Sequence, residues 1–314
     1  MLARYPTRRP RVSSEGGGYR RRMVRSADGR IARRLLASAI VTVVASNASG
    51  VATARPPLIA AAGDIACATP CRAQRATARL VERLDPDAVL TLGDNQYDAG
   101  RLSEFRRSYD PTWGRFKGRT FPVPGNHEYI TSGASGFFTY FRQRTSRSGS
   151  YSIDLGRWHV VALNSKSGGP PDQRRLRWLR RDLRRDRHRC EVAYFHHPRW
   201  SSGRLHGPTR AMGRFWKVLH RQGVDVVLSG HEHHYERFAR LTPWGRTSPR
   251  GIRQFVVGTG GAVSYGFGDT VRGSQRRIVA HGVLTMRLWN EAYQWRFVRS
   301  DGAILDAGHT LCHN

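Results

Sequence analysis

Lysine is nearly absent from this chain of 314 residues, although the chain is strongly basic. Only Lys117, Lys166 and Lys217 are lysines among 53 basic residues, and all the others are arginines. So uniform a preference for arginine indicates a compositional bias of the genome rather than a face shaped to bind phosphates. The arginines are also spread along the chain instead of forming one block, which weakens an interpretation as a nucleic-acid-binding protein.

Acidic residues are scarce as well: 23 of them leave a formal net charge of +30. Residues 1–54 hold eleven of the basic and two of the acidic residues, so the remainder still carries +21. A basic surface attracts phosphorylated molecules over long distances. A nucleic-acid-binding protein would carry a similar charge, but its affinity would fall steeply with salt and would need no metal. A solvated arginine-rich surface is the simpler interpretation, and we expect no specific nucleic-acid partner.

The apolar run near the N-terminus, residues 35–45, is too short to span a bilayer as a stable helix. It follows the basic segment 20–34 and precedes Ala52-Thr53-Ala54, which is the three-part layout of a secretory signal peptide. We expect residues 1–54 to be a basic leader and signal peptide that is cleaved after Ala54. The protein would then be secreted, or lie at the cell surface or in the periplasm, without a stable membrane anchor. A disordered leader on a cytosolic protein is the alternative.

Cysteine is also scarce, and the lack of any Cys-x2-Cys pair argues against a zinc finger. An even number of cysteines in an exported chain favours disulfides. Cys67 and Cys71 are close enough in sequence to close a small loop. Cys190 and Cys312 would then tie the C-terminus to the strand before His196. Four cysteines allow three pairings, so this pairing is one hypothesis among three.

Short apolar runs recur through residues 55–314, each followed by turn signals. Runs of this kind are typical of strands buried on both faces, and they cover residues 58–62, 88–92, 158–163, 192–195, 224–228, 255–257, 283–289 and 293–298. The last two alternate more and predict an antiparallel pair near the surface. Amphipathic helices are predicted between the runs, over residues 72–84, 171–187 and 209–222. This alternation indicates an α/β fold in a single domain, residues 55–314.

Five polar motifs follow apolar runs, where ligand clusters mark functional sites in open α/β sheets. They are Gly63-Asp64-Ile65-Ala66, Gly93-Asp94-Asn95-Gln96-Tyr97, Gly125-Asn126-His127-Glu128, His196-His197-Pro198 and Gly230-His231-Glu232-His233. Together they supply a ligand set for two metal ions: Asp64, Asp94, Tyr97, Asn126, His196, His231 and His233. Two adjacent metals generate hydroxide at neutral pH and clamp a phosphoryl group, so the motifs predict a metal-dependent phosphoesterase.

The chemistry of each residue suits the metal-binding role predicted for it. The carboxylate of Asp94 has two oxygens and can bridge two ions, and the phenolate of Tyr97 would be a hard ligand for a highly charged ion. His231 and His233 flank one residue in an extended segment, so both imidazoles share a face. Taken alone, Asp64 would be interpreted as a turn or helix cap, and Tyr97 as a packed aromatic. Their joint occurrence favours the metal centre.

Other residues of these segments predict the rest of the site. His127 suits general acid catalysis because the ordinary pKa of histidine lies near neutrality. Glu128 follows it and is expected to orient it. Only one of His196 and His197 is expected to reach a metal, so His197 is predicted to hold phosphate oxygens, together with His206 from a flexible loop.

The five motifs resemble those of the calcineurin-like metallophosphoesterases and, more narrowly, those of the purple acid phosphatases. The family pattern is Asp-x-Gly, Gly-Asp-x-x-Tyr, Gly-Asn-His-Glu/Asp, Val-x-x-His and Gly-His-x-His, and the resemblance covers residues 58 to about 240. Two departures are Ala66 in place of the glycine and Ala193 in place of the valine. The broad family begins with Asp-x-His, which is missing here, and Tyr97 would replace that histidine as in the purple acid branch.

The resemblance implies a two-sheet β sandwich flanked by helices, in four layers, with the metals at the strand ends. One ion, Fe(III), would be held by Asp64, Asp94, Tyr97 and His233. The second, Fe(II), Zn or Mn, would be held by Asp94, Asn126, His196 and His231. The expected reaction is hydrolysis of phosphate monoesters on small molecules, by in-line attack of a metal-bound hydroxide. Alternatives are a phosphodiesterase or nucleotide hydrolase on the same site, a nucleic-acid-binding protein, and an inactive scaffold with a structural metal site.

Overall fold

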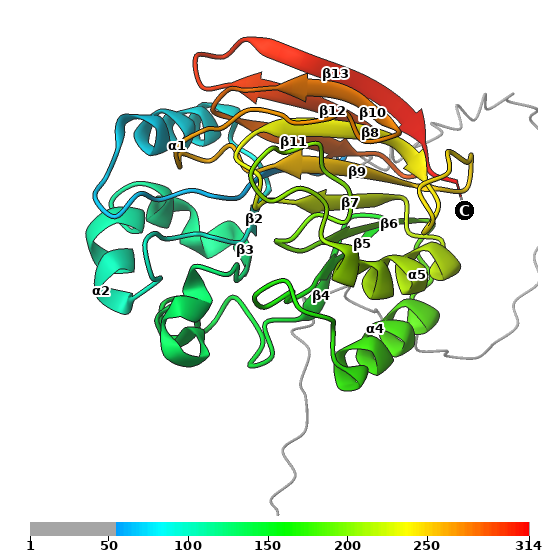
Figure 1. The fold of residues 1–314 in the computed structure, drawn as a ribbon, viewed down its shortest axis with the longest axis horizontal. Coiled ribbons are helices and arrows are strands. Elements are labelled where there is room, and N and C mark those ends of the chain that lie inside the picture. Colours follow the sequence, from blue (N-terminus) through cyan, green and yellow to red (C-terminus); the bar gives the residue numbers. More distant parts are fainter. Residues whose placement is uncertain (1–54, 314) are drawn as a thin grey trace, which may run out of the picture. The chain divides into compact units, whose positions relative to one another are not determined.

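Two β-sheets packed face to face form the centre of this computed structural model, which describes residues 55–313 (Figure 1). The predicted leader, residues 1–54, lies outside the described residues. In sheet order, the six-stranded sheet contains β13 (Ile304–Leu311), β12 (Ala292–Arg299), β11 (Gly282–Leu288), β1 (Leu58–Ala62), β2 (Ala88–Leu92) and β3 (Thr120–Val123). The seven-stranded sheet contains β10 (Ser274–Ile278), β8 (Tyr235–Leu241), β9 (Ile252–Val257), β7 (Val226–Ser229), β6 (Cys190–Tyr194), β5 (Trp158–Ala162) and β4 (Tyr151–Leu155).

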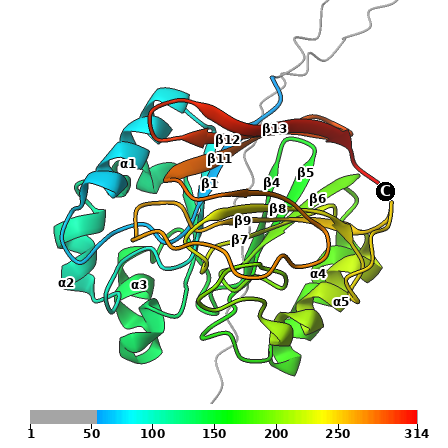
Figure 2. The ribbon, with the colours of Figure 1, turned by 45° about the horizontal axis from the view of Figure 1, so that its top comes forward.

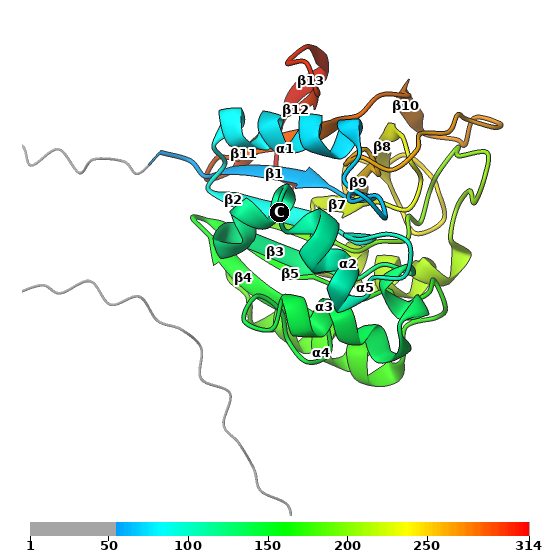
Figure 3. The same ribbon diagram turned by 90° about the vertical axis from the view of Figure 1, so that its left-hand side faces the viewer.

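Helices cover the outer face of each sheet, so the domain has four layers (Figures 2 and 3). The six-stranded sheet carries α1 (Arg72–Leu84), α2 (Leu102–Glu104), α3 (Ser135–Tyr140) and the short turns η1 (Phe105–Tyr109), η2 (Trp113–Arg119), η3 (Glu128–Ile130) and η4 (Ser132–Ala134). The seven-stranded sheet carries α4 (Gln173–Arg185), α5 (Gly213–Gln222) and the turn η5 (Arg210–Met212). The sandwich flanked by helices is therefore confirmed. Within residues 55–313, none of the helices is both long enough and apolar enough to cross a membrane.

The apolar runs of the sequence become the buried strands of both sheets. The core between the sheets contains Ile59 and Leu90 from one sheet and Val160, Val192 and Val226 from the other, all fully buried. Side chains on the opposite faces of these strands pack under the helices, which explains why the runs are continuous rather than alternating. Helix α4 buries Leu176, Leu179 and Leu183 and leaves its arginines, apart from Arg175, on the outer side.

The eight predicted strands are all present, but several details of the predictions are wrong. Helix α5 begins at Gly213 rather than at residue 209. Helix α4 begins at Gln173, after the capping side chain of Asp172, rather than at residue 171, and it ends at Arg185. Strands β11 and β12 are antiparallel as predicted, but β11 is buried between β1 and β12 instead of lying near the surface. The strands that the prediction missed carry polar or charged side chains; β10, for example, reads Ser-Gln-Arg-Arg-Ile.

The topology places the five motifs at one rim of the sandwich. Strands β1, β2 and β3 are parallel, and so are β5, β6 and β7. Each motif follows the carboxyl end of one of these strands, where the chain leaves the sheet. Two disulfides, Cys67–Cys71 and Cys190–Cys312, match the predicted pairing, and the second ties the C-terminal end of the chain to β6.

Candidate metal centre

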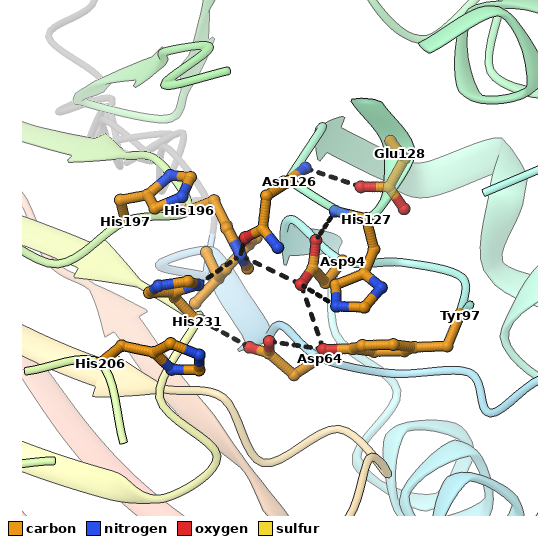
Figure 4. Close-up of polar contacts among 12 residues, drawn as sticks. Asp64, Asp94, Tyr97, Asn126, His127, Glu128, His196, His197, His206 and His231 are labelled. Carbon is orange, nitrogen blue, oxygen red and sulfur yellow. Dashed lines mark hydrogen bonds and ion pairs between the residues drawn. The ribbon is translucent and has the colours of Figure 1, made fainter. Parts of the chain in front are cut away.

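The seven predicted ligands come together at one rim of the sandwich, although they come from five loops of two sheets. Figure 4 labels all of them except His233, whose Nε2 lies 3.0 Å from the Tyr97 hydroxyl. Four follow strands of the six-stranded sheet: Asp64 after β1, Asp94 and Tyr97 after β2, and Asn126 after β3. Three follow strands of the seven-stranded sheet: His196 after β6, and His231 and His233 after β7. The rim of the sandwich therefore gathers oxygen and nitrogen donors that are far apart in sequence.

One group of side chains surrounds the phenol of Tyr97. Its hydroxyl lies 3.0 Å from Oδ1 of Asp64, 3.1 Å from Oδ2 of Asp94 and 3.0 Å from Nε2 of His233. Nε2 of His233 also lies 3.3 Å from Oδ1 of Asp64. These four side chains therefore present their donor atoms to a common point.

A second group surrounds Nε2 of His196. This atom lies 3.0 Å from Oδ1 of Asn126, 3.2 Å from Nδ1 of His231 and 3.3 Å from Oδ2 of Asp94. Oδ2 of Asp94 thus belongs to both groups, and Figure 4 shows Asp94 between them. The two groups have the same members as the two ligand sets that the resemblance implies.

The charges of this site suit cations. Asp64 is fully buried and Asp94 is 2% exposed. The ion pairs that the structure describes for them involve only histidines: His233 for Asp64, and His196 and His127 for Asp94. Buried carboxylates normally need a fully charged partner or a metal, because leaving water costs them several kcal/mol. In a chain with fifty arginines, two buried carboxylates paired only with histidines fit a site for metal ions.

The site also shifts the pKa values of its members. Burial, Asp64 and Asp94 raise the pKa of Tyr97 well above its usual value, so the phenol keeps its proton while these carboxylates are its only charged neighbours. Burial would lower the pKa of His196, but Asp94 outweighs this effect and raises it to about 9. Burial and the neighbouring His196 lower the pKa of His231, which stays neutral. A positive ion beside Tyr97 would instead lower the pKa of the phenol and favour the phenolate.

Glycines next to the ligands let the backbone come close to the donor atoms. A Cβ atom at Gly125 would lie 2.2 Å from Oδ1 of Asp94, and one at Gly230 would lie 2.6 Å from Oδ2 of Asp64. Both distances are shorter than any tolerated contact. The glycine that opens each of these two motifs is therefore required by the space that the carboxylate beside it occupies.

Three of the candidate ligands have backbone angles that side chains rarely adopt. The φ angle is 59° at Asp64, 46° at Asp94 and 73° at His231. Residues in this left-handed region cost of order 1 kcal/mol or more and cluster at functional sites. The backbone is held there by hydrogen bonds from the site, including His231 N to Oδ2 of Asp64 at 2.8 Å.

Backbone carbonyls orient the histidines of the centre. Nδ1 of His196 donates to the Leu92 carbonyl at 2.9 Å, and Nδ1 of His233 donates to the Val263 carbonyl at 2.7 Å. Each bond places the proton on Nδ1 and leaves Nε2 free to act as a ligand. The sequence carries no signal for these partners, because every residue has a carbonyl.

His127 lies at the edge of the centre with its side chain 30% exposed. Its Nδ1 donates to the Asp98 carbonyl at 2.5 Å, and its Nε2 lies 4.0 Å from Oδ2 of Asp94. The ring also packs on Tyr97, with 4.2 Å between centroids. Nε2 therefore faces Asp94, which is the orientation that the predicted general acid needs.

Glu128 does not orient His127, contrary to prediction. Its fully buried carboxylate accepts hydrogen bonds from the backbone N–H of Gln96 at 3.1 Å and of Gly125 at 2.6 Å. Burial and the nearby Asp94 raise its pKa to about 8. The side chains of His127 and Glu128 diverge because the turn η3 begins at Glu128. Glu128 therefore clamps the second and third motifs together.

The two predicted phosphate contacts differ in access. His197 is 3% exposed, and Nδ1 of its ring lies 2.9 Å from the hydroxyl of Ser165. His206 is exposed, and its ring centroid lies 4.3 Å from that of His231. Tyr265 also belongs to this part of the site, although the sequence did not predict it. Its hydroxyl donates to the His231 carbonyl at 2.8 Å and lies 3.1 Å from Nδ1 of His206. Its place in a glycine-rich segment, residues 258–268, was the available signal.

Curated relatives of the chain are acid phosphatases. The chain is 28% identical to purple acid phosphatase 21 of Arabidopsis thaliana over 198 residues, which are 58% of this chain and 45% of that protein. It is 28% identical to acid phosphatase type 7 of Homo sapiens over 249 residues, which are 65% of this chain and 55% of that protein. The chain spans about half the length of these relatives.

Solved structures share the fold. The purple acid phosphatase PPD1 from yellow lupin seeds has a TM-score of 0.65 and 17% identity, covering 81% of this chain and 53% of that chain. GAP50, the anchor in the inner membrane complex of Plasmodium, has a TM-score of 0.66 and 14% identity, covering 82% of this chain and 89% of that chain. At these identities the likeness concerns the fold alone, and a fold by itself does not decide activity.

A family model supplies the remaining comparison. The model described as calcineurin-like phosphoesterase matches residues 57–235, more than half of the 314 residues and all five motifs. The chain therefore belongs to the calcineurin-like phosphoesterase family.

Proposed function

We propose that the chain is a binuclear-metal phosphatase that hydrolyses phosphate monoesters of small molecules. The observation that carries the proposal is the position of Asp94, whose Oδ2 lies 3.1 Å from the Tyr97 hydroxyl and 3.3 Å from Nε2 of His196. An oxygen shared by two donor groups is what a bridging carboxylate requires. The names of these relatives, which are acid phosphatases, support phosphate monoesters rather than diesters as the substrates.

Two metal ions would be held in these groups. Fe(III) fits the group of Asp64, Asp94, Tyr97 and His233, because a phenolate is a hard ligand. Fe(II), Zn or Mn fits the group of Asp94, Asn126, His196 and His231. When bound, the pair would supply an activated water and neutralise charge on the phosphoryl oxygens.

A residue of the chain would supply the proton that the leaving group needs. His127 is the general acid in this proposal: its Nδ1 proton is held by the Asp98 carbonyl, so a second proton on Nε2 faces the centre. Transfer of that proton to the leaving alkoxide matters most for substrates with poor leaving groups. Glu128 contributes by holding the loops that carry Asp94 and Asn126 at a fixed separation.

His206 is the better placed of the two proposed phosphate contacts. It is exposed beside His231, whereas His197 is buried and neutral, because burial and the neighbouring His196 lower its pKa to about 3. Neutral His197 can still donate one hydrogen bond through Nε2 to a phosphate oxygen that reaches it. The charge of +21 on residues 55–314 would draw phosphorylated substrates towards the protein.

Export belongs to the same proposal. Residues 1–54 would act as leader and signal peptide, cleaved after Ala54, and residues 55–314 would form the secreted, cell-surface or periplasmic phosphoesterase domain. The disulfide Cys190–Cys312 supports this, because disulfides persist in oxidising compartments.

The test combines metal content with substrate choice. Purified protein loaded with iron and zinc should retain two ions per chain at this centre, absorb visible light through a phenolate–iron band, and turn over aryl monoesters faster than diesters. Faster turnover of diesters would replace the monoesterase by a phosphodiesterase on the same site. Fewer than two ions per chain would overturn the binuclear proposal.

A further inference from the structure

A second cluster of carboxylates and histidines lies where α4 meets the edge of the seven-stranded sheet. Asp154, His159 and Glu191 are neighbours in register across β4, β5 and β6. Asp182 comes from the last turns of α4, and Asp186 and His188 follow its end. None of these six residues belongs to the metal centre described above.

The donor atoms of this cluster lie within ligand distance of one another. Nδ1 of His159 is 2.7 Å from Oδ1 of Asp154 and 3.7 Å from Oδ1 of Asp186. Nδ1 of His188 is 2.6 Å from the same Asp186 oxygen. One donor atom from each of Asp154, His159, Asp186 and His188 lies within 4.8 Å of every other.

The cluster carries more negative charge than its partners balance. Asp154, Asp182 and Asp186 form ion pairs only with His159 and His188 among the described residues, although arginines surround them in sequence. Glu191 is 4% exposed, and its Oε2 is buried without a hydrogen-bond partner in the described part of the chain. Glu191 lies against Asp186, a member of the cluster. A buried carboxyl oxygen without a hydrogen-bond donor at this place fits a missing cation.

We propose that Asp154, His159, Asp186 and His188 bind one structural zinc ion, at a site separate from the catalytic centre. Two imidazoles and two carboxylates are a ligand set that zinc accepts in tetrahedral sites. Zinc bonds of about 2.0–2.1 Å place tetrahedral ligands about 3.3 Å apart. Three of the six separations, 2.6, 2.7 and 3.7 Å, bracket this value, and the other three lie within 4.8 Å, so side-chain shifts would complete the site.

The surroundings of His159 support its assignment as a ligand through Nδ1. Its Nε2 lies 3.0 Å from Oδ2 of Asp182, whose other oxygen accepts a hydrogen bond from Ser152 at 3.0 Å. This carboxylate holds the proton of His159 on Nε2 and leaves Nδ1 for the ion, as partners of zinc-binding histidines do. The ion would join β4 and β5 to the chain that follows α4, so its role is structural.

Zinc alone is the probe for this site. Full-length protein is stripped with a chelator, reloaded with zinc and compared with the variants Asp154→Asn and His188→Ala. His309→Ala is the control, because His309 is an exposed histidine on β13. The side chains of Asp154 and His188 are 54% and 26% exposed, so both variants are expected to fold. Zinc content is measured by elemental analysis, and the position of the ion by anomalous diffraction at the zinc edge.

The proposal predicts an anomalous peak between His159 and His188, and one zinc fewer per chain in both cluster variants than in the control. It also predicts that zinc raises the Tm of an Asp94→Asn protein, whose catalytic centre is damaged, by about 5 °C, and that Asp154→Asn removes this shift. Equal zinc contents in all variants, with no peak at the cluster, would overturn it. That result would leave the phosphatase proposal standing, because the catalytic centre is read separately through Asp94→Asn.

Discussion

The hydroxyl of Tyr97 lies 3.0 Å from Nε2 of His233, a residue 136 positions further along the chain. The two side chains come from different sheets, one after β2 and the other after β7. An oxygen and a nitrogen donor at this distance are placed to share one ion, and the phenol is the donor that gives the site a spectroscopic signal.

Replacement of Tyr97 by phenylalanine should abolish the visible absorption band of iron-loaded protein. The ring would keep its packing on His127, so the fold should survive. Absorption spectra of the wild type and the variant at equal iron content check this. Tyr265→Phe is the matched control, because its ring lies 4.5 Å from that of His233 but its phenol is outside the proposed ligand set. A band that persists in Tyr97→Phe and disappears in Tyr265→Phe would reassign the ligand.

Asp94→Asn should remove both metals and reduce turnover by more than about a hundredfold. Even residues that only orient ligands typically contribute 10–100-fold, and Asp94 contacts both donor groups. Elemental analysis and monoester turnover are measured side by side. Asp269→Asn, an exposed aspartate, is the control. Full retention by Asp94→Asn of one ion at this centre, beyond the zinc proposed between His159 and His188, would mean that this carboxylate serves one metal rather than two.

His127→Ala should keep both metals but lose turnover on alkyl phosphates by about 10²–10⁴-fold, the usual contribution of a general acid. Aryl phosphates should lose far less, because their leaving groups need no proton. The ratio of alkyl to aryl turnover is the measurement, with His309→Ala as the control. Equal losses on both substrates would show that His127 acts in some other way, for example by packing against Tyr97.

Gly125→Ala should disrupt the centre, whereas Gly118→Ala should leave it intact. The new methyl group at position 125 would lie 2.2 Å from Oδ1 of Asp94, but the same group at position 118 meets nothing within 4 Å. Forced packing of this kind costs about 1–3 kcal/mol, and here the atoms that must move are a ligand and its backbone. Metal content and Tm of the two variants provide the comparison. Equal metal affinity would contradict the close approach of Gly125 to Asp94 that the structure describes.

Asp306→Asn should destabilise the sandwich by about 1–3 kcal/mol, because it leaves partly buried hydrogen-bond donors without their charged acceptor. Asp306 on β13 accepts hydrogen bonds from Arg237 and Tyr235 on β8 and so links the two sheets. Urea denaturation gives the free energy of unfolding. Asp301→Asn, in an exposed pair with Arg299, is the control and should change stability little.

The same carboxylate predicts a dependence of stability on pH. Burial would raise the pKa of Asp306, but Arg237 and Tyr235 outweigh this effect and lower it below 3.8. A lowered pKa in the folded state means that the contribution is complete above the ordinary pKa of 3.8 and is lost as the pH falls through the folded value. Unfolding free energies of the wild type and Asp306→Asn should therefore converge on acidification below about pH 4. A constant difference down to pH 2 would contradict the assignment.

The meeting of these side chains could be predicted from the sequence because the motifs that carry them follow apolar runs. The carboxyl ends of parallel strands meet at one rim, so residues such as Asp64 and His231 come together whatever the length of chain between them. The orienting partners could not be predicted, since His196 and His233 are held by the carbonyls of Leu92 and Val263.

Errors in the predictions have equally local causes. Glu128 was paired with His127 because they are adjacent, but a turn begins between them and separates their side chains. Strand β8 was missed because Tyr235, Phe238 and Leu241 are three residues apart with charged residues between them, so the alternation typical of a strand is absent. The cluster around His159 could not be predicted because its members come together only through the register of β4, β5 and β6.

Four proposed ligands leave one sheet and three leave the other, so neither half of the sandwich alone carries a complete set. Ions bound there would join the two sheets at this rim of the sandwich. Chelation should then loosen this rim first, and amide protons of the loops after β1 and β7 should exchange faster while the opposite rim stays protected. Hydrogen exchange would in this way report ion loss without any knowledge of the natural substrate.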